Sequence, residues 1–229
     1  IVKLLQEEIS FLNLLFTRHS KAPNSWFHRK WILRKLMQYH NTTTASSSLT
    51  TESLSSSSWL FQMIRQEIKI CTNVAERFPK NYYAWTHRIF VVDELVLGAR
   101  PSSSSPTTTP PPTTTTTLLS AVQPHIQIIL EEEWKTVEPW LQRHVSDHSA
   151  VHYGGQILSK LLDHYLKLQE KEKDDEGDNH HHNNNHDRHH HPYVVQALDL
   201  IQNAMESSRR LVELYPTHEV MWIWRRKCT

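Results

Sequence analysis

The stretch that decides the fold reads Lys80-Asn81-Tyr82-Tyr83-Ala84-Trp85-Thr86-His87-Arg88. Asn81 is of a residue type that caps helices, so we expect a helix to begin after it and to stop at Gly98. One turn into this helix, Trp85 would fill the wedge between two neighbouring helical hairpins. Arg88 shares a helix face with Trp85, so it can stack on an aromatic ring or pair with a carboxylate of a neighbour.

Three other stretches match this one. Residues 23–29 contain Trp26, residues 218–225 contain Trp222, and residues 147–154 form a degenerate copy with Val151 as its anchor. The four anchors are 59, 66 and 71 residues apart, or 41, 46 and 48 once three inserts are removed. This period is typical of stacked helical hairpins, because one hairpin cannot bury its own apolar face.

The inserts span residues 41–58, 99–118 and 170–192. The first two are dominated by Ser and Thr, and the third is charged and then rich in Asn, with seven histidines between His180 and His191. Such compositions bury too little apolar surface to offset the chain entropy, so we expect disordered loops. The histidine run could bind metal, although a low-complexity expansion is the simpler interpretation.

Outside the inserts, apolar residues recur at spacings of three and four, which predicts amphipathic helices and no strand. The expected fold class is therefore all-α, with residues 1–229 as a single α-solenoid domain of four hairpins. Because the chain starts at Ile1 and stops at Thr229 inside a helical pattern, we expect it to be a fragment of a longer protein. The helices are expected at residues 1–18, 25–39, 59–78, 82–97, 122–144, 147–168, 193–215 and from 219 onward.

The composition excludes several classes of protein. Only 4 glycines occur and no Gly-rich phosphate loop, which removes the common nucleotide-binding folds. The formal net charge of +1 gives no argument for nucleic-acid binding, and the apolar runs are too short for a membrane span. The 2 cysteines cannot build a disulfide framework or a structural zinc site, and they favour a reducing compartment, so we expect a cytoplasmic protein.

The pattern Lys-Asn-Tyr-x-x-Trp-x-His-Arg at residues 80–88 resembles the repeat of protein prenyltransferase alpha subunits. The other three copies extend this resemblance over nearly all of the chain outside the inserts. Residues 145–153 and 218–222 are most similar to those members of the family that carry a degenerate repeat. The resemblance implies a right-handed superhelix of stacked hairpins, similar to tetratricopeptide arrays, that wraps around a β subunit.

The resemblance also implies an activity. In that family the β subunit holds the catalytic zinc and the isoprenoid pocket, and the heterodimer transfers a prenyl group from its diphosphate to a protein cysteine. For this chain it implies a type III geranylgeranyltransferase with no cofactor on the chain itself and a partner similar to the Rab geranylgeranyltransferase β subunit. Its substrates would be lipidated cytosolic proteins with C-terminal cysteines, such as a SNARE.

Site residues follow from the repeat register that the resemblance implies. Lys21, five residues before Trp26, falls where the family keeps a catalytic lysine whose ammonium neutralises charge on the leaving diphosphate. Tyr82 matches a tyrosine that contacts the diphosphate, and Tyr83 falls where related subunits have a histidine. If the register is shifted by one repeat, Lys80 takes the catalytic role; for both lysines, a solvated turn residue is the simpler interpretation.

The remaining motif residues are expected in repeat packing or in the partner interface. We expect His28 and His87 to be packed and hydrogen-bonded rather than to bind a metal. The i,i+4 pair of His148 and His152 lacks an evident third metal ligand, so no metal site is expected on this chain. The whole set comprises Trp26, His28, Arg29, Asn81, Trp85, His87, Arg88, Asp147, His148, His152, Tyr153, Trp222 and Arg225.

Two interpretations of function stay open. The first is the prenyltransferase α subunit, and the second is a solenoid adaptor that binds a protein partner without chemistry. The chain departs from the family pattern at Pro23, where many relatives keep a tyrosine, and at Gly154, where the third copy would have its arginine. Glycine is unfavourable inside helices, so the pair Gly154-Gly155 predicts a hairpin that is bent or pressed against a partner.

Overall fold

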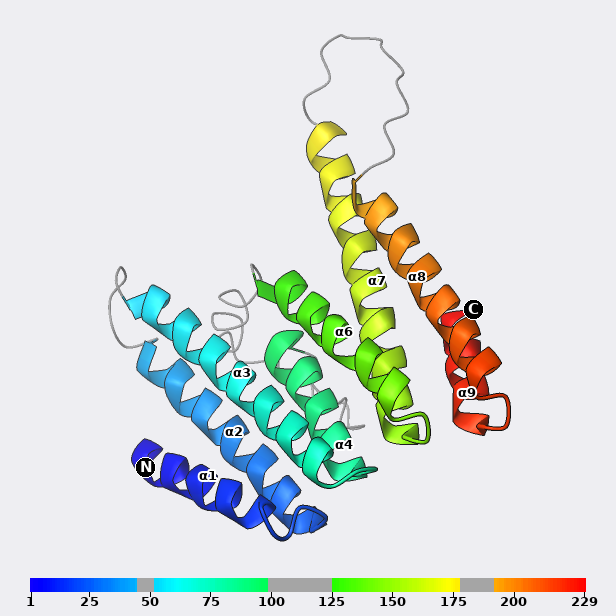
Figure 1. Ribbon diagram of the computed structural model, residues 1–229. Coiled ribbons are helices and arrows are strands. Elements are labelled where there is room, and N and C mark those ends of the chain that lie inside the picture. The colour runs from blue at the N-terminus through cyan, green and yellow to red at the C-terminus, as the bar shows by residue number, and fades with distance from the viewer. Residues whose placement is uncertain (45–51, 99–124, 178–191) are drawn as a thin grey trace, which may run out of the picture. The chain divides into compact units, whose positions relative to one another are not determined.

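The computed structural model describes residues 1–44, 52–98, 125–177 and 192–229, which form helices and short turns (Figure 1). They fall into two compact units, Ile1–Ile129 and Leu130–Thr229. Each unit contains two helical hairpins, and no strand occurs among the described residues. The all-α class and the hairpin repeat predicted from the sequence are therefore confirmed.

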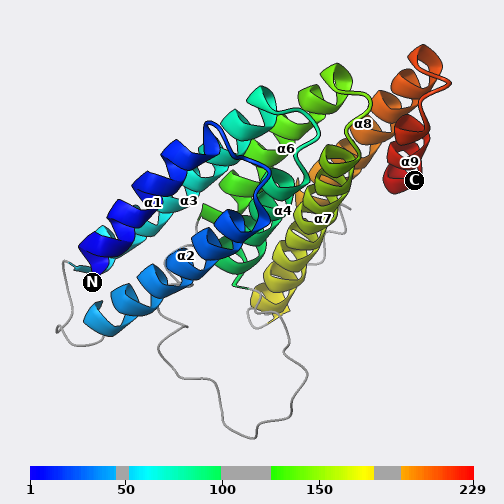
Figure 2. The same ribbon diagram turned by 90° about the horizontal axis from the view of Figure 1, so that it is seen from below.

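The first unit consists of α1 (Val2–Phe16), α2 (Pro23–Thr44), α3 (Glu52–Arg77) and α4 (Tyr82–Phe90), which a π-helical stretch (Val91–Val96) prolongs. The four helices run side by side in the view from below (Figure 2). Pro23 occupies the first position of α2, where a missing N–H costs nothing and the fixed φ suits the helix. Proline is therefore compatible with this position.

Two apolar clusters hold this unit together. The first joins α1 to α2 within one hairpin, and the second joins that hairpin to α3 and α4. In the second cluster the Trp26 ring stacks on Phe16 with 4.0 Å between ring centroids, so the anchor tryptophan fills the space between two hairpins. The members of the first cluster are Leu5, Leu12, Ile32 and Leu36, and those of the second are Phe16, Trp26, Cys71, Val74 and Ala84.

Both ends of the α4 segment carry the expected signals. Asn81 Oδ1 accepts hydrogen bonds from the backbone N–H groups of Tyr83 and Ala84 at 3.1 and 3.3 Å, so it is the N-cap. Gly98 follows the last turn with a φ of 68°, a left-handed conformation that glycine adopts without strain. The π-helical turn between these ends has no signature in the sequence pattern.

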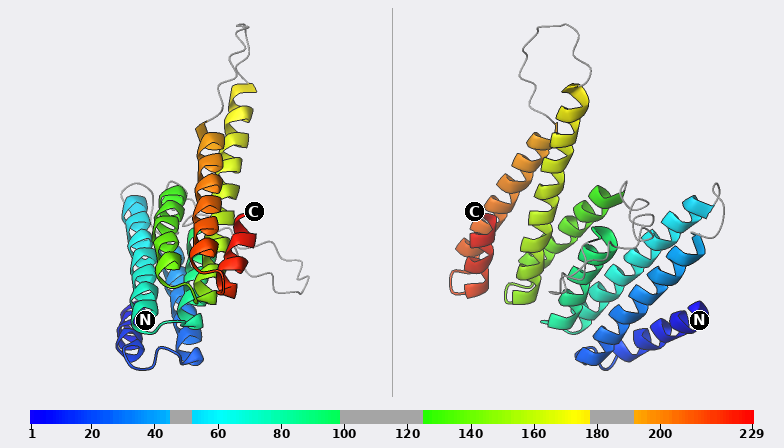
Figure 3. Two further views of the ribbon diagram at one scale, coloured as in Figure 1. Left: turned by 45° about the vertical axis from the view of Figure 1, so that its right-hand side comes forward. Right: turned by 180° about the vertical axis from the view of Figure 1, so that it is seen from behind.

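The second unit contains most of α6 (Ile126–Arg143), together with α7 (His148–Gly177), α8 (Pro192–Leu214) and α9 (Glu219–Cys228). Figure 3 shows α7 and α8 side by side, with α9 packed against their lower part. Asp147 caps α7 by accepting from the backbone N–H groups of Ser149 and Ala150 at 3.1 and 3.2 Å. The cap position thus repeats from one unit to the other.

Three helices reach into two of the predicted inserts. Helix α2 continues to Thr44 and α3 begins at Glu52, inside the expected disordered range 41–58, and α7 continues to Gly177, inside the range 170–192. Extending an existing helix adds one hydrogen bond for each residue that is fixed, so a polar sequence can prolong a helix that packing has already nucleated. The insert 99–118 and the histidine run lie outside the described residues.

Candidate functional site

Arg29, Glu67 and His87 form a buried ionic cluster in the first unit. Arg29 Nε and Nη2 donate to the two carboxylate oxygens of Glu67, both at 2.7 Å, in the bidentate geometry that the guanidinium favours. His87 Nε2 lies 2.9 Å from Glu67 Oε2, and the three side chains are 3% exposed or less. Because Arg29 belongs to the first hairpin and the other two to the second, the cluster links two repeats.

Glu67 is ionised and His87 is neutral in this cluster. Burial alone would raise the pKa of Glu67, but the hydrogen bond from His87 and the charge of Arg29 outweigh it and lower that pKa to about 2. Burial lowers the pKa of His87, and its bond to Glu67 offsets only part of this effect. An ionised carboxylate only accepts, so His87 Nε2 carries the proton, and Nδ1 is buried with no partner among the described residues.

The same arrangement recurs in other hairpins. A glutamate of the first helix contacts the residue that stands twenty positions later on the second helix. Sequence reasoning aligned only the second helices and so missed these glutamates, although each stands eighteen residues before its anchor. The pairs are Glu8 with His28 at 3.2 Å, Glu67 with His87 at 2.9 Å, and Glu133, which accepts from the buried hydroxyl of Tyr153.

The fourth hairpin replaces this polar pair by an apolar one. Twenty residues before Trp224 stands Ala204, and both are buried. A Cβ on Gly154 would lie 3.4 Å from the Trp224 ring and 3.3 Å from Leu141, so the indole takes the space that a side chain at Gly154 would need. In the third copy, the Trp224 indole therefore lies against the position where the other copies have their arginine. The Gly154-Gly155 pair lies within the continuous helix α7 and packs against α9.

One carbonyl joins the two turns of the first unit. The Ser20 carbonyl oxygen accepts from Trp26 Nε1 at 2.8 Å within its own hairpin and from Asn81 Nδ2 at 3.1 Å in the next hairpin. Asn81 thereby caps α4 with its oxygen and fixes the neighbouring turn with its nitrogen. The turn before α2 and the turn before α4 consequently lie at the same edge of the unit (Figure 1).

The candidate diphosphate residues lie at this edge. Lys21 directly follows Ser20, and Lys80 and Tyr82 flank Asn81, so the structure brings all three to neighbouring turns. The two lysines are exposed and Tyr82 is 61% exposed, whereas Tyr83 is half-buried against the Phe16 cluster. The edge presents two ammonium groups and a phenol to solvent, and the neighbouring Tyr83 packs against the cluster that contains Phe16.

The remaining motif residues have packing roles or face solvent. Arg88 donates to Thr72 Oγ1 at 2.9 Å and stacks over the buried Trp85 ring, 5.6 Å from its centroid. His148 and His152 are exposed on α7. Within the described residues, no group of three or more His, Cys, Asp or Glu side chains is arranged to hold a metal ion.

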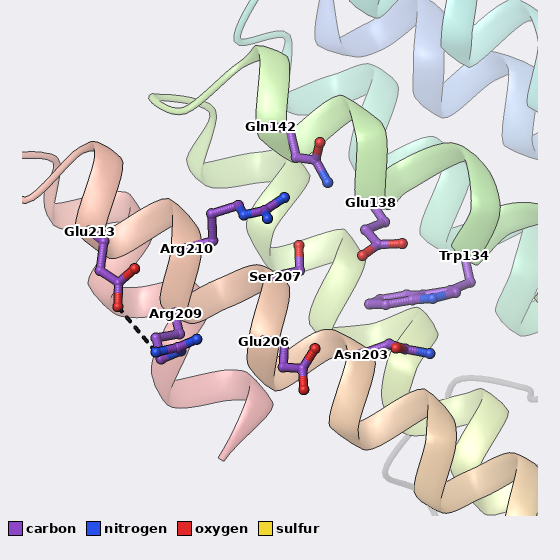
Figure 4. Close-up of a pocket in the computed structure, with 9 residues that line it drawn as sticks. All are labelled: Trp134, Glu138, Gln142, Asn203, Glu206, Ser207, Arg209, Arg210 and Glu213. Atoms are coloured by element: carbon purple, nitrogen blue, oxygen red, sulfur yellow. Dashed lines mark ion pairs between the residues drawn. The ribbon is translucent and has the colours of Figure 1, made fainter.

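A polar groove of about 610 Å³ lies between α6 and α8 in the second unit (Figure 4). Arg209 forms an ion pair with Glu213 at 3.5 Å on its rim, and Trp134 lies at its other end. No candidate site residue lines this groove, so the cavity and the predicted site are separate features. Over the ranges that the structure describes, no helix is both long and apolar enough to cross a bilayer.

Comparisons with known proteins agree with the repeat pattern. The family model of the protein prenyltransferase alpha subunit repeat matches residues 5–36 and 64–95. Over 96% of its length, the chain is 26% identical to protein prenyltransferase alpha subunit repeat-containing protein 1 of Danio rerio, and over 93% it is 27% identical to the protein of the same name of Homo sapiens. It spans 46% and 47% of those two proteins, or about half of their length.

The first match covers most of α1 with the start of α2, and the second covers the C-terminal half of α3 with α4, so each falls on one hairpin of the first unit. The buried anchors Trp26 and Trp85 lie inside them. The sequence motif, the hairpin geometry and the comparisons thus agree on the same repeat. This chain carries the protein prenyltransferase alpha subunit repeat and is similar over most of its length to proteins named for that repeat.

Proposed function

We propose that this chain is part of the α subunit of a heterodimeric protein prenyltransferase, similar to geranylgeranyltransferase type III, and that it scaffolds a zinc-bearing β subunit. The observation that carries the proposal is the hydrogen bond from Asn81 to the Ser20 carbonyl. This bond holds two turns together, so the exposed Lys21 and Tyr82 face solvent from one edge. Similarity to the prenyltransferase repeat supports the same assignment.

Lys21 is proposed to act on the leaving group. When a protein thiolate attacks the first carbon of the prenyl diphosphate, the carbon–oxygen bond breaks and negative charge grows on the departing diphosphate. A fixed ammonium next to that oxygen lowers the barrier, because it stabilises charge that develops only in the transition state. The Tyr82 hydroxyl would donate to the same group, and the partner's zinc would hold the substrate cysteine as a thiolate. Lys80, on the adjacent turn, is the alternative cation.

The partner is proposed to bind on the exposed aromatic face of α2. Phe27 and Trp31, one helical turn apart, are 65% and 49% exposed, and the His28 ring stacks on Trp31 with 5.8 Å between centroids. Exposed aromatic side chains of this kind anchor protein interfaces. We expect a β subunit similar to that of Rab geranylgeranyltransferase there, protein substrates with C-terminal cysteines such as a SNARE, and a cytoplasmic location.

The test is co-expression of the full-length protein with such a β subunit, followed by an assay of geranylgeranyl transfer to a cysteine peptide. We expect the two to co-purify, and Lys21→Ala to lower kcat by about two to three orders of magnitude. Lys69→Ala, an exposed lysine on α3, is the matched control and should leave kcat unchanged. A loss in Lys80→Ala but not in Lys21→Ala would move the catalytic role to Lys80, and unchanged kcat in both would remove it.

The second candidate is an adaptor that binds a protein partner without chemistry. The observation that favours it is that polar groups of the motif take part in packing, since Arg29 and His87 both bind Glu67 in the interior. An adaptor would capture a partner through Phe27 and Trp31 without altering the activity of any β subunit. Partner capture that Trp31→Ala abolishes, together with unchanged transfer by the β subunit, would support this function over the first.

A further inference from the structure

The junction between the first two hairpins has three components. Trp26, 2% exposed, is covered by Cys71, Val74 and Ala84 of the following hairpin. The carbonyl that accepts from the Trp26 indole also accepts from the cap residue of the following hairpin. Arg29 receives the carboxylate of Glu67 from that same hairpin. The first hairpin thus contributes three groups to the junction. Its tryptophan meets apolar side chains of the next hairpin, its turn carbonyl meets the cap residue, and its arginine meets the glutamate.

The fourth hairpin repeats the first half of this junction. Trp222 Nε1 donates at 2.9 Å to the carbonyl of Pro216, six residues earlier, as Trp26 does at 2.8 Å to the carbonyl six residues before it. Arg225 Nη1 donates at 2.7 Å to the carbonyl of Met205, twenty residues earlier, and Arg29 Nη1 lies 3.5 Å from the carbonyl at the same spacing. Trp222 and Arg225 are therefore the structural equivalents of Trp26 and Arg29.

The second half of the junction is open at this hairpin. Trp222 is 49% exposed, and Leu214 and Tyr215 of the adjoining turn are 63% and 36% exposed. The Arg225 guanidinium is held through Nη1, which also donates to Ser208 Oγ at 3.2 Å. Its Nε and Nη2 atoms, which in Arg29 hold the glutamate, meet no acceptor within the described parts of the chain. The half-buried Arg225 therefore keeps one edge of its guanidinium without an acceptor among the described residues, one helical turn from an exposed indole.

In the junction inside the second unit, the arginine and the glutamate are both absent. There the first hairpin has Gly154 in place of the arginine, and the next has Ala204 in place of the glutamate, with Trp224 filling the space. A buried arginine without its carboxylate would lower the free energy of unfolding by several kcal/mol. We therefore expect the arginine and the glutamate to be present together or absent together. The cap position also repeats, since His218 Nδ1 lies 3.2 Å from Ser146 Oγ in the turn of the preceding hairpin.

We infer that Trp222, Arg225 and the turn 214–216 form a docking face for one further helical hairpin of this repeat, whose first helix carries a glutamate for Arg225. The apolar side chains of that hairpin cover the Trp222 indole, and its cap residue donates to the Pro216 carbonyl. The inference rests on the equivalence of this face to the first half of the buried junction in the first unit. The Nε and Nη2 atoms of Arg225 have no acceptor among the described residues, and the same atoms of Arg29 bind a carboxylate, so we expect a carboxylate here. It stands independently of any prenyl transfer.

The experiment extends the chain in register. Because Trp222 corresponds to Trp26, Thr229 corresponds to Leu33. A copy of residues 34–98 is therefore placed directly after Thr229, and it brings a hairpin that carries a glutamate to the docking face. The matched control is a copy of residues 159–229 at the same place. It is in register because Trp222 also corresponds to Val151, and it carries Ala204 in place of the glutamate. Hydrogen exchange of the backbone amides of α9 is measured in both extended chains and in the unextended chain.

We expect the glutamate-bearing extension to slow exchange in α9 by about tenfold or more, and the alanine-bearing extension to have a much smaller effect. In the first extended chain, Arg225→Gln and Gln at the copied Glu67 should each remove most of the protection, and the double variant should be no worse than either. The neighbouring exposed Arg226→Gln is the control and should keep the protection. Equal protection by both extensions, or by neither, would overturn the inference.

Sedimentation velocity of the unextended chain completes the test. A monomer over a wide range of concentration is expected, because the face is proposed for a covalently continuous hairpin. If the chain instead dimerises and Arg225→Gln abolishes the dimer, the occupant is a second copy, and the proposed occupant is wrong.

Discussion

Glu67 and His87 meet at 2.9 Å in the interior of the first unit, whereas Glu8 and His28, which stand at the same spacing in the preceding hairpin, meet at 3.2 Å with both side chains more than 40% exposed. The difference lies in Arg29, whose guanidinium covers the Glu67 carboxylate from the neighbouring hairpin. One pair is thereby a structural link between repeats and the other is a surface contact.

Removal of the buried carboxylate is predicted to be costly. Glu67→Ala leaves Arg29 charged and buried without its partner, so we expect the free energy of unfolding to fall by about 3 to 5 kcal/mol. Glu8→Ala, at the equivalent exposed position, should cost less than about 1 kcal/mol. Urea denaturation of both variants checks this difference, and similar losses for the two would contradict the structural role of the cluster.

Acid is predicted to weaken the cluster in two steps. The folded pKa of His87 is lowered from 6.5, so below that pH the unfolded chain binds a proton that the folded chain does not, and stability falls. The folded pKa of Glu67 is about 2 against 4.5 in the unfolded chain, so its contribution is complete above about 4.5 and is lost as the pH falls toward 2.

The free energy of unfolding of the wild type and of His87→Gln, measured from pH 8 to pH 4, isolates the first step. Glutamine keeps a donor for Glu67 but does not titrate, so the two curves should run parallel above about pH 6.5 and converge or cross below it. Curves that stay parallel over the whole range would show that His87 keeps an ordinary pKa in the folded chain.

The two glycines of α7 are predicted to differ. The nearest atoms to a Cβ at Gly155 belong to the exposed Lys227 side chain, which can move away, so Gly155→Ala should stabilise the chain by up to about 1 kcal/mol through helix propensity. Gly154→Leu would push against the buried Trp224 and should cost about 1 to 3 kcal/mol. Thermal unfolding of the two variants tests this, and a stabilising Gly154→Leu would contradict the packing.

Equivalent tryptophans are predicted to contribute unequally. Trp26→Ala empties a buried position and should lower the free energy of unfolding by about 3 to 5 kcal/mol. Trp222→Ala removes the same indole-to-carbonyl hydrogen bond from a half-exposed position and should cost about 1 kcal/mol. Comparison of the two in guanidinium is the measurement, and a larger loss at Trp222 would show that its indole is already covered.

Part of the candidate site could be predicted from the sequence. The cap at Asn81 and the stop at Gly98 follow from local backbone requirements, and the positions of Lys21 and Tyr82 follow from the repeat register. The ionic cluster could not be predicted by aligning only the second helices, because Glu67 is distant in sequence from Arg29 and meets it only when hairpins stack. Helices α2, α3 and α7 extend into two of the predicted inserts, because helix propagation can continue into polar sequence.

The sequence by itself determined the all-α class, the hairpin units and the register of the motif, because apolar periodicity and caps act within a few residues of one another. The tertiary structure decided which copies of the motif are buried and which are open. Trp26 and Trp222 occupy the same position and make the same hydrogen bond, yet one is 2% and the other 49% exposed. Burial depends on whether another hairpin covers the indole, and no residue within the motif encodes that contact.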